Sequence, residues 1–132
     1  MFDVLDRPKV WIPIYWPGLA PSDVEGEVAK AVEHRIDVLV ELLDRDPLID
    51  IFELSADENN KVERTAEQER QREREIFNRL VFDWWRVFSS GQPVPFNPEN
   101  VDKMLKLNNF PMAFTTAYLQ ACGGKVETRA GN

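Results

Sequence analysis

Two stretches near the N-terminus alternate between two kinds of side chain, and this alternation limits the possible fold more than any other feature. In residues 9–16, KVWIPIYW, every second residue is aliphatic or aromatic on one face, namely Val10, Ile12, Ile14 and Trp16. A period of two with β-branched and aromatic side chains predicts a strand. Pro13 has no backbone N–H to donate, so we expect this strand at a sheet edge.

Residues 32–42 alternate in the same way. One face carries Val32, His34, Ile36, Val38, Val40 and Leu42, and the other carries Glu33, Arg35, Asp37 and Glu41. Residues 28–42 also fit one stripe of a helix, because Val28, Val32, Ile36 and Val40 recur every four residues. We favour a strand over 30–42, paired with 9–16 as an antiparallel hairpin. Residues 17–26 are rich in proline, glycine and serine, which is typical of a connecting loop.

Cap residues followed by apolar periodicity predict about four helices. Asp46 with Pro47 marks the start of a helix over 47–55. Thr65 with Gln68 has the capping-box spacing and introduces a helix over 66–88. The remaining two are expected over 98–107, after Asn97 and Pro98, and over 111–122, beginning at Pro111 and ending at Gly123 and Gly124.

The expected helix over 66–88 has two unlike halves. Its first half is charged on every side, so we expect a solvent-exposed face, a docking surface for a partner helix, or a segment that becomes ordered only on binding. Its second half has apolar residues every three to four positions, namely Ile76, Phe77, Leu80, Val81, Trp84, Val87 and Phe88. On a helix Trp84 would face the core. Trp85 would lie at the edge, where it either covers the following turn or stays exposed as a partner anchor.

The predicted fold is therefore α+β, with a two-stranded hairpin packed on a bundle of about four helices. The chain has 132 residues, the size of one domain, and we assign residues 1–124 to that domain. Residues 125–132 form a polar tail that we expect to be mobile.

Charge and cysteine content exclude several functional classes. The net charge is −7, and basic residues are interspersed with acidic ones, so we expect no nucleic-acid partner. The single cysteine, Cys122, cannot form an intramolecular disulfide, which favours a reducing cytoplasm. No apolar run reaches membrane-spanning length and no signal peptide is recognisable, so we expect neither membrane insertion nor export.

The sequence offers no set of residues for catalysis, and we expect neither an enzyme nor a cofactor. His34 is the only histidine, and no partner for it as a general base is identifiable. Two acidic groups could bind a hard cation, namely Asp44, Asp46 and Asp50, and Asp57, Glu58, Asn59 and Asn60. Neither has the order of a calcium loop, and we assign both to helix capping and turns, with no metal site.

One stretch has an order of features that resembles a known family. Residues 80–122 contain Trp84 and Trp85, then Gly91, then PVPF at 93–96, a capped NPEN at 97–100, and a final helix. This order resembles the tail assembly chaperones of long-tailed bacteriophages and prophages, in which a tryptophan-ended helix precedes a glycine turn and such a capped helix. The long charged segment 61–75 and the doubled tryptophan depart from the family pattern.

The resemblance implies a non-enzymatic role in tail morphogenesis in the cytoplasm of the bacterial host. Such a protein would coat and solubilise the tape measure protein, help recruit the major tail protein and be absent from the mature virion. Members often self-associate, and many have a longer, frameshifted form. Candidate partner-binding residues in this chain are Trp85, Phe88, Phe96, Arg70 and Arg74. The alternatives are a structural virion component, such as a minor tail or head–tail connector protein, and a small-ligand module walled by Trp85, Phe88 and Phe96.

Overall fold

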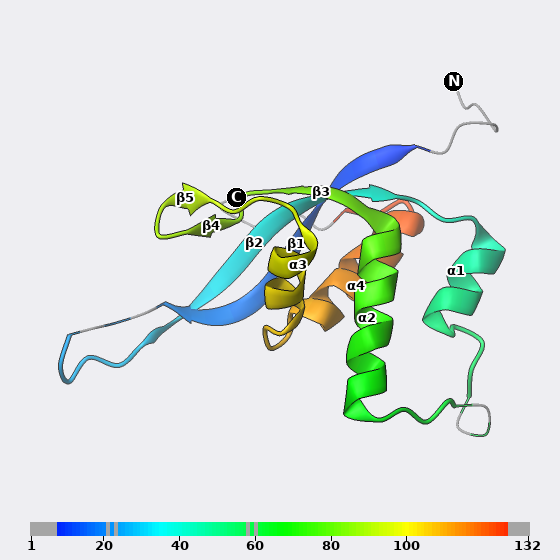
Figure 1. Ribbon diagram of the computed structural model, residues 1–132, viewed down its shortest axis with the longest axis horizontal. Coiled ribbons are helices and arrows are strands. Elements are labelled where there is room, and N and C mark those ends of the chain that lie inside the picture. The colour runs from blue at the N-terminus through cyan, green and yellow to red at the C-terminus, as the bar shows by residue number, and fades with distance from the viewer. Residues whose placement is uncertain (1–7, 21, 23, 58, 60, 127–132) are drawn as a thin grey trace.

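The protein has an α+β fold, in which one layer of helices packs on a three-stranded antiparallel sheet (Figure 1). The computed structural model describes residues 8–20, 22, 24–57, 59 and 61–126. The strands are β1 (Lys9–Ala20), β2 (Lys30–Glu41), β3 (Val81–Trp85), β4 (Phe88–Ser89) and β5 (Gln92–Pro93). The helices are α1 (Arg45–Phe52), α2 (Ala66–Leu80), α3 (Pro98–Leu105) and α4 (Phe110–Cys122).

The N-terminal hairpin is confirmed, and residues 30–41 are strand and not helix. β1 and β2 pair along their whole length, from Lys9 opposite Glu41 to Ala20 opposite Lys30. β1 therefore extends into the predicted loop and includes Pro17 and Gly18. The sheet order is β1-β2-β3, so β1 is an edge strand. An edge strand tolerates the missing N–H of proline because that side of the strand need not pair.

The prediction of one helix over 66–88 was wrong, and so was the prediction of only two strands. The helix α2 ends at Leu80, and the next residues form β3, which pairs antiparallel with β2. Both tryptophans therefore lie on a strand. Trp84 is buried on the helix-covered face, whereas Trp85 is 60% exposed on the other.

A β-bulge explains why β3 looked helical in the sequence. Val40 of β2 lies opposite Val81, whereas its neighbour Leu39 lies opposite Asp83, so Phe82 has no partner in the register. A bulge inserts one residue and breaks the two-residue alternation. Val81 and Trp84 are consequently both buried at a spacing of three, the same spacing that a helix stripe would show.

The core lies between the inner sheet face and the helices. The sheet contributes Ile12, Ile14, Trp16, Ile36, Val38, Val40, Val81 and Trp84, and the helices contribute Phe77, Leu80, Val101, Phe110, Phe114, Tyr118 and Ala121. The predicted aliphatic faces of both hairpin strands supply much of this set. Among the described residues, no helix combines the length and apolarity needed to cross a membrane.

The turn after the tryptophans is a rigid corner. Ser90 and Gly91 both have positive φ, 51° and 78°, as a tight two-residue hairpin turn between β4 and β5 requires. The Trp84 indole Nε1 donates to the Val94 carbonyl at 2.8 Å, and the Phe96 ring packs edge-on against Trp84 at 5.1 Å. These contacts hold the segment against the sheet before α3 begins.

Four predicted helix boundaries shift by a few residues. The helix α1 begins at Arg45 after Asp44 rather than at Pro47, because a proline is tolerated throughout the first helical turn. It ends at Phe52, since Glu53 has left-handed geometry with φ 53°. The helix α3 ends at Leu105, and α4 begins at Phe110 after Asn109, which is also left-handed.

The capping box at the start of α2 is confirmed and gives a testable contribution to stability. The Gln68 backbone N–H donates to Thr65 Oγ1 at 3.1 Å, and the Thr65 N–H donates to Gln68 Oε1 at 3.0 Å. Thr65→Ala removes one acceptor for these otherwise unpaired amides, so we expect the free energy of unfolding to fall by about 1 kcal/mol. Urea denaturation, monitored by circular dichroism, measures this change in the free energy of unfolding. Thr65→Ser retains the acceptor and should change stability much less.

Candidate binding surface

The outer face of the sheet, opposite the helices, carries exposed aromatic side chains. Trp11 of β1 is 50% exposed, Phe82 of β3 is 41% exposed, and Trp85 is 60% exposed. The register places Trp11 opposite Leu39, and Leu39 opposite Asp83 beside Phe82. Lys9 Nζ lies 3.9 Å above the Phe82 ring, which places both side chains on this face. We call the surface formed by Trp11, Leu39, Phe82 and Trp85 the aromatic face.

A buried carboxylate links two arginines beside the aromatic face. Arg35 Nε donates to Asp37 Oδ1 at 3.1 Å, and Arg86 Nε donates to Asp37 Oδ2 at 3.0 Å. Asp37 is 7% exposed, and two guanidinium groups compensate its loss of water. One negative charge is therefore shared between two positive ones, which leaves the group with a net positive charge.

Aromatic rings and the backbone fix the positions of the two guanidinium groups. The Arg86 Cζ lies 4.6 Å from the centre of the Trp85 ring, and the Arg35 Cζ lies 5.5 Å from the centre of the Tyr15 ring. Arg86 has φ 73°, a left-handed conformation that is unfavourable for a side chain of this size. The ion pair with Asp37 offsets that strain. The left-handed conformation at Arg86 also turns the chain away from β2 after β3 ends.

The two arginines line a surface pocket of about 630 Å³ between β2 and the segment after β3. His34, Val87 and Phe88 also line it, together with residues 16–19 of β1, Met104 of α3 and residues 107–109 of the connection to α4. The His34 ring packs against Trp16 at 5.5 Å. A Cβ atom at Gly18 would lie 2.2 Å from His34 Nε2, so the imidazole can occupy this position only because residue 18 is glycine.

The five candidate residues from the sequence lie in different environments. Trp85 belongs to the aromatic face, and Phe88, 61% exposed on β4, lines the pocket. Phe96 is half-buried against Trp84, so it forms no common wall with the other two aromatic residues. Arg70 and Arg74 lie on α2. Arg70 is exposed, whereas Arg74 donates to Asp102 Oδ1 at 2.6 Å and ties α2 to α3.

Sequence reasoning missed the Arg35–Asp37–Arg86 group. The alternation of β2 already placed Arg35 and Asp37 on one face, where side chains two positions apart are neighbours. Arg86 is 49 residues further along the chain from Asp37. Its place beside Asp37 depends on β3 pairing with β2, and the sequence predicted a helix there.

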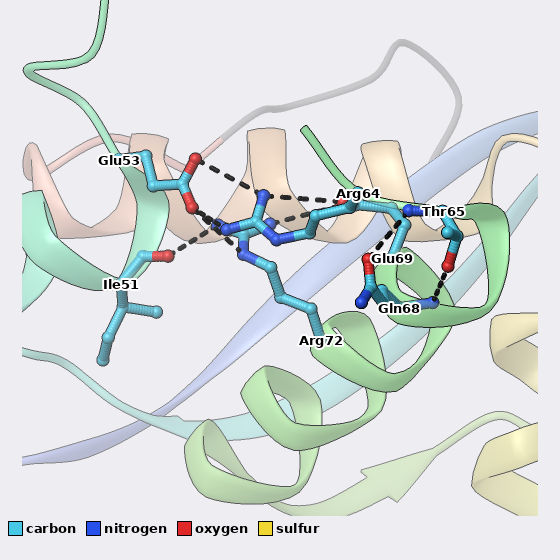
Figure 2. A network of polar contacts seen from close by, with 7 residues as sticks. All are labelled: Ile51, Glu53, Arg64, Thr65, Gln68, Glu69 and Arg72. Atoms are coloured by element: carbon cyan, nitrogen blue, oxygen red, sulfur yellow. Dashed lines mark hydrogen bonds and ion pairs between the residues drawn. The ribbon is translucent and has the colours of Figure 1, made fainter. Parts of the chain in front are cut away.

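The charged first half of α2 is bound to the end of α1 by a network of arginines and glutamates (Figure 2). Arg72 Nη2 donates to the Ile51 carbonyl at 2.6 Å, and its Nη1 lies 3.3 Å from Glu69 Oε1. Arg64 pairs with Glu53, and this hydrogen bond holds the pKa of the Glu53 carboxyl below its usual range. The segment for which we expected a solvent-exposed face or a docking surface therefore ties α2 to the end of α1.

Among the residues that the structure describes, no group of three or more histidine, cysteine, aspartate or glutamate side chains could hold a metal ion. Of the two acidic groups considered as cation ligands, Asp44 precedes α1, and Asp57 accepts from the Asn59 N–H at 2.9 Å in a turn. Glu58 and Asn60 lie outside the described residues, as do residues 127–132 of the predicted tail.

Comparisons of this chain with protein-family models, with curated proteins and with solved structures found no match.

Proposed function

We propose that this protein is a bacteriophage tail assembly chaperone that binds and solubilises the tape measure protein and helps recruit major tail protein subunits. The observation that carries the proposal is the aromatic face. Three large aromatic side chains, Trp11, Phe82 and Trp85, are 41% to 60% exposed on one side of a sheet whose other side is already packed. Exposed aromatic groups on a rigid sheet are typical anchors for a protein partner.

Two further observations support this role. The resemblance over residues 80–122 points to tail assembly, and residues 88–97 form a tight turn where the family has its glycine turn. One element of the family pattern differs, since the tryptophans of this chain end a strand and not a helix. The chain carries a net charge of −7, which helps a protein with exposed apolar groups remain dispersed while it binds an aggregation-prone helix.

Within this proposal the protein acts without catalysis or a cofactor in the cytoplasm of the bacterial host. It would leave the finished tail, and self-association is compatible with the role. Mass spectrometry of purified virions tests this part. A stoichiometric amount of the protein in virions would favour a structural component, such as a minor tail or connector protein, over a chaperone.

A pull-down at low salt with the tape measure protein of the same phage tests the binding itself. We expect association with the wild-type chain and about 30-fold or greater weakening by Trp85→Ala, because an aromatic anchor that becomes buried on binding contributes ~2 kcal/mol or more. The matched control is Met112→Ala, which removes a 72% exposed apolar side chain from α4. It should bind normally.

Thermal unfolding of both variants shows whether any loss of binding reflects unfolding. The removed side chains are mostly exposed, so we expect stability changes within about 0.5 kcal/mol. No association of the wild-type chain at low salt would contradict the proposed function. Association that Trp85→Ala and Met112→Ala weaken equally would contradict the aromatic face as the binding surface.

A further inference from the structure

The Arg35–Asp37–Arg86 group lies on the outer face of the sheet, next to the aromatic face. Asp37 is opposite Trp85, and Arg35 is two residues from Asp37 on the same strand. Residues opposite each other in an antiparallel pair share a face, as do residues two apart in a strand. Leu39 of the aromatic face is therefore only one row of side chains, ~7 Å, from Asp37.

Both guanidinium groups retain unused hydrogen-bond donors. Each binds Asp37 through Nε, at 3.1 Å from Arg35 and 3.0 Å from Arg86. Among the residues that the structure describes, the Nη1 and Nη2 atoms of these two arginines donate no hydrogen bond. The side chains of Arg35 and Arg86 are 31% and 49% exposed, so a partner can reach these nitrogens. They are donors suited to a carboxylate, which a guanidinium binds through two parallel hydrogen bonds.

The two guanidinium groups are already held in place. The Trp85 ring supports Arg86, the Tyr15 ring supports Arg35, and the carboxylate of Asp37 joins both. Donors that are fixed beforehand lose less side-chain entropy on binding. This pair should therefore bind a carboxylate more tightly than two mobile surface arginines would.

The charges of the outer face fit a single carboxylate better than a polyanion. The two arginines share one negative charge, that of Asp37, and lie in the middle of the face. Asp83 and Glu41 lie toward one end of it and Glu33 lies toward the other. A nucleic-acid backbone would meet these carboxylates, whereas one acidic side chain needs only the local excess of positive charge.

We infer that the aromatic face binds an amphipathic helix of the partner in which an acidic side chain lies one turn from an apolar one. The apolar side chain packs on Trp85 and Leu39, and Arg35 and Arg86 bind the carboxylate through their Nη atoms. Side chains one helical turn apart are separated by about 5–6 Å, close to the ~7 Å between the two rows of the sheet. The inference rests on the proposed function and specifies the chemistry of its partner.

The test uses the whole chain and three synthetic helical peptides with blocked ends. All three have the same leucine stripe and differ only at the positions one turn from it, which are glutamate, glutamine or lysine. We expect the glutamate peptide to bind about 10-fold more tightly than the glutamine peptide, because charge-assisted hydrogen bonds add to the apolar contact. The net charge of −7 would by itself favour the lysine peptide, so tighter binding of the glutamate peptide identifies the arginine pair.

Tryptophan indole N–H signals locate the bound peptide in NMR titrations. Trp11 and Trp85 are exposed on the outer face, whereas Trp16 and Trp84 are buried on the inner one. We expect saturable shifts of the Trp11 and Trp85 signals and of the Arg86 Nε–H signal. The signals of the two buried tryptophans should shift much less.

Arg86→Gln separates recognition of the carboxylate from the integrity of the face. It should weaken binding of the glutamate peptide about 10-fold and change binding of the glutamine peptide by no more than about twofold. Arg79→Gln, which removes an exposed arginine of α2, is the matched control and should leave both affinities within about twofold. Equal weakening of both peptides by Arg86→Gln would contradict a contact between Arg86 and the carboxylate.

Three results with the wild-type chain would also overturn the inference, and they do not depend on how any variant folds. They are binding of the glutamate peptide no tighter than that of the glutamine peptide, no saturable shift of the Trp11 and Trp85 signals, or tighter binding of a single-stranded RNA oligonucleotide, which would indicate a nucleic-acid surface. A failed pull-down with the tape measure protein contradicts the tail function and leaves the peptide result standing. A successful pull-down without discrimination among the peptides contradicts only this inference.

Discussion

Replacing Phe77 by alanine is expected to lower the free energy of unfolding by about 4 kcal/mol. Phe77 is completely buried on the inner side of α2, and its ring packs at 4.9 Å from Phe114 and 6.2 Å from Phe110. The truncation removes these ring contacts between α2 and α4 and leaves a cavity in the core. Equilibrium denaturation in urea, followed by circular dichroism, measures the change.

Phe88→Ala is the matched control for this variant. Phe88 is 61% exposed on β4, so the same deletion there should change the free energy of unfolding by no more than about 0.5 kcal/mol. The sequence assigned both residues to one apolar stripe of one helix. Similar losses for the two variants would therefore support that single helix and contradict the end of α2 at Leu80.

Tyr118→Phe is expected to lower the free energy of unfolding by about 2–3 kcal/mol. The buried Tyr118 hydroxyl donates to the Glu41 carbonyl at 2.7 Å and accepts from the Leu43 N–H at 3.0 Å. It thus pairs two backbone groups where β2 ends and the chain turns into α1. Phenylalanine retains the stacking on Phe52 but leaves both backbone groups without this partner.

Because of this buried hydroxyl group, we expect the protein to become less stable at alkaline pH. Burial raises the pKa of Tyr118 above its ordinary value of 10.0. The folded protein then retains a proton that the unfolded chain releases. Its contribution to stability is complete below pH ~10 and falls by up to about 1.4 kcal/mol per pH unit as the pH rises from there toward the folded-state pKa.

Denaturation curves at several pH values between 9 and about 11.5 check this pH dependence. The wild-type chain should lose stability across this range more steeply than Tyr118→Phe, which has no phenol to ionise at that position. Parallel losses in the two proteins would show that another group is responsible for alkaline unfolding.

Local signals in the sequence were sufficient for most of the fold. Alternation identified both strands of the hairpin, and the edge position of β1 followed from Pro13. Thr65 with Gln68 and Asn97 with Pro98 located the starts of α2 and α3, because these side chains bond to amides only three residues away. Such contacts depend on neighbours in the chain and need no knowledge of the tertiary structure.

Residues 81–88 could not be predicted in this way. The bulge at Phe82 gives Val81 and Trp84 the three-residue spacing of a helix, and nothing local distinguishes the two cases. These residues form a strand because β2 has a free edge. The backbone N–H and C=O groups from Asp37 to Val40 need hydrogen-bond partners there, and β3 supplies them. That edge exists only once the hairpin has formed, about forty residues away in the chain.

Local patterns were enough to predict the two hairpin strands, the starts of α2 and α3 and the glycine turn at Gly91, since alternation, capping and a tight turn each involve residues close together in the chain. The exposure of the aromatic residues and the position of Arg86 depend instead on how the strands pair. Trp84 and Trp85 point to opposite faces because they belong to a strand, and Arg86 reaches Asp37 because that strand pairs with β2. A surface made from three strands depends on their pairing, which is a property of the folded chain and not of any one segment.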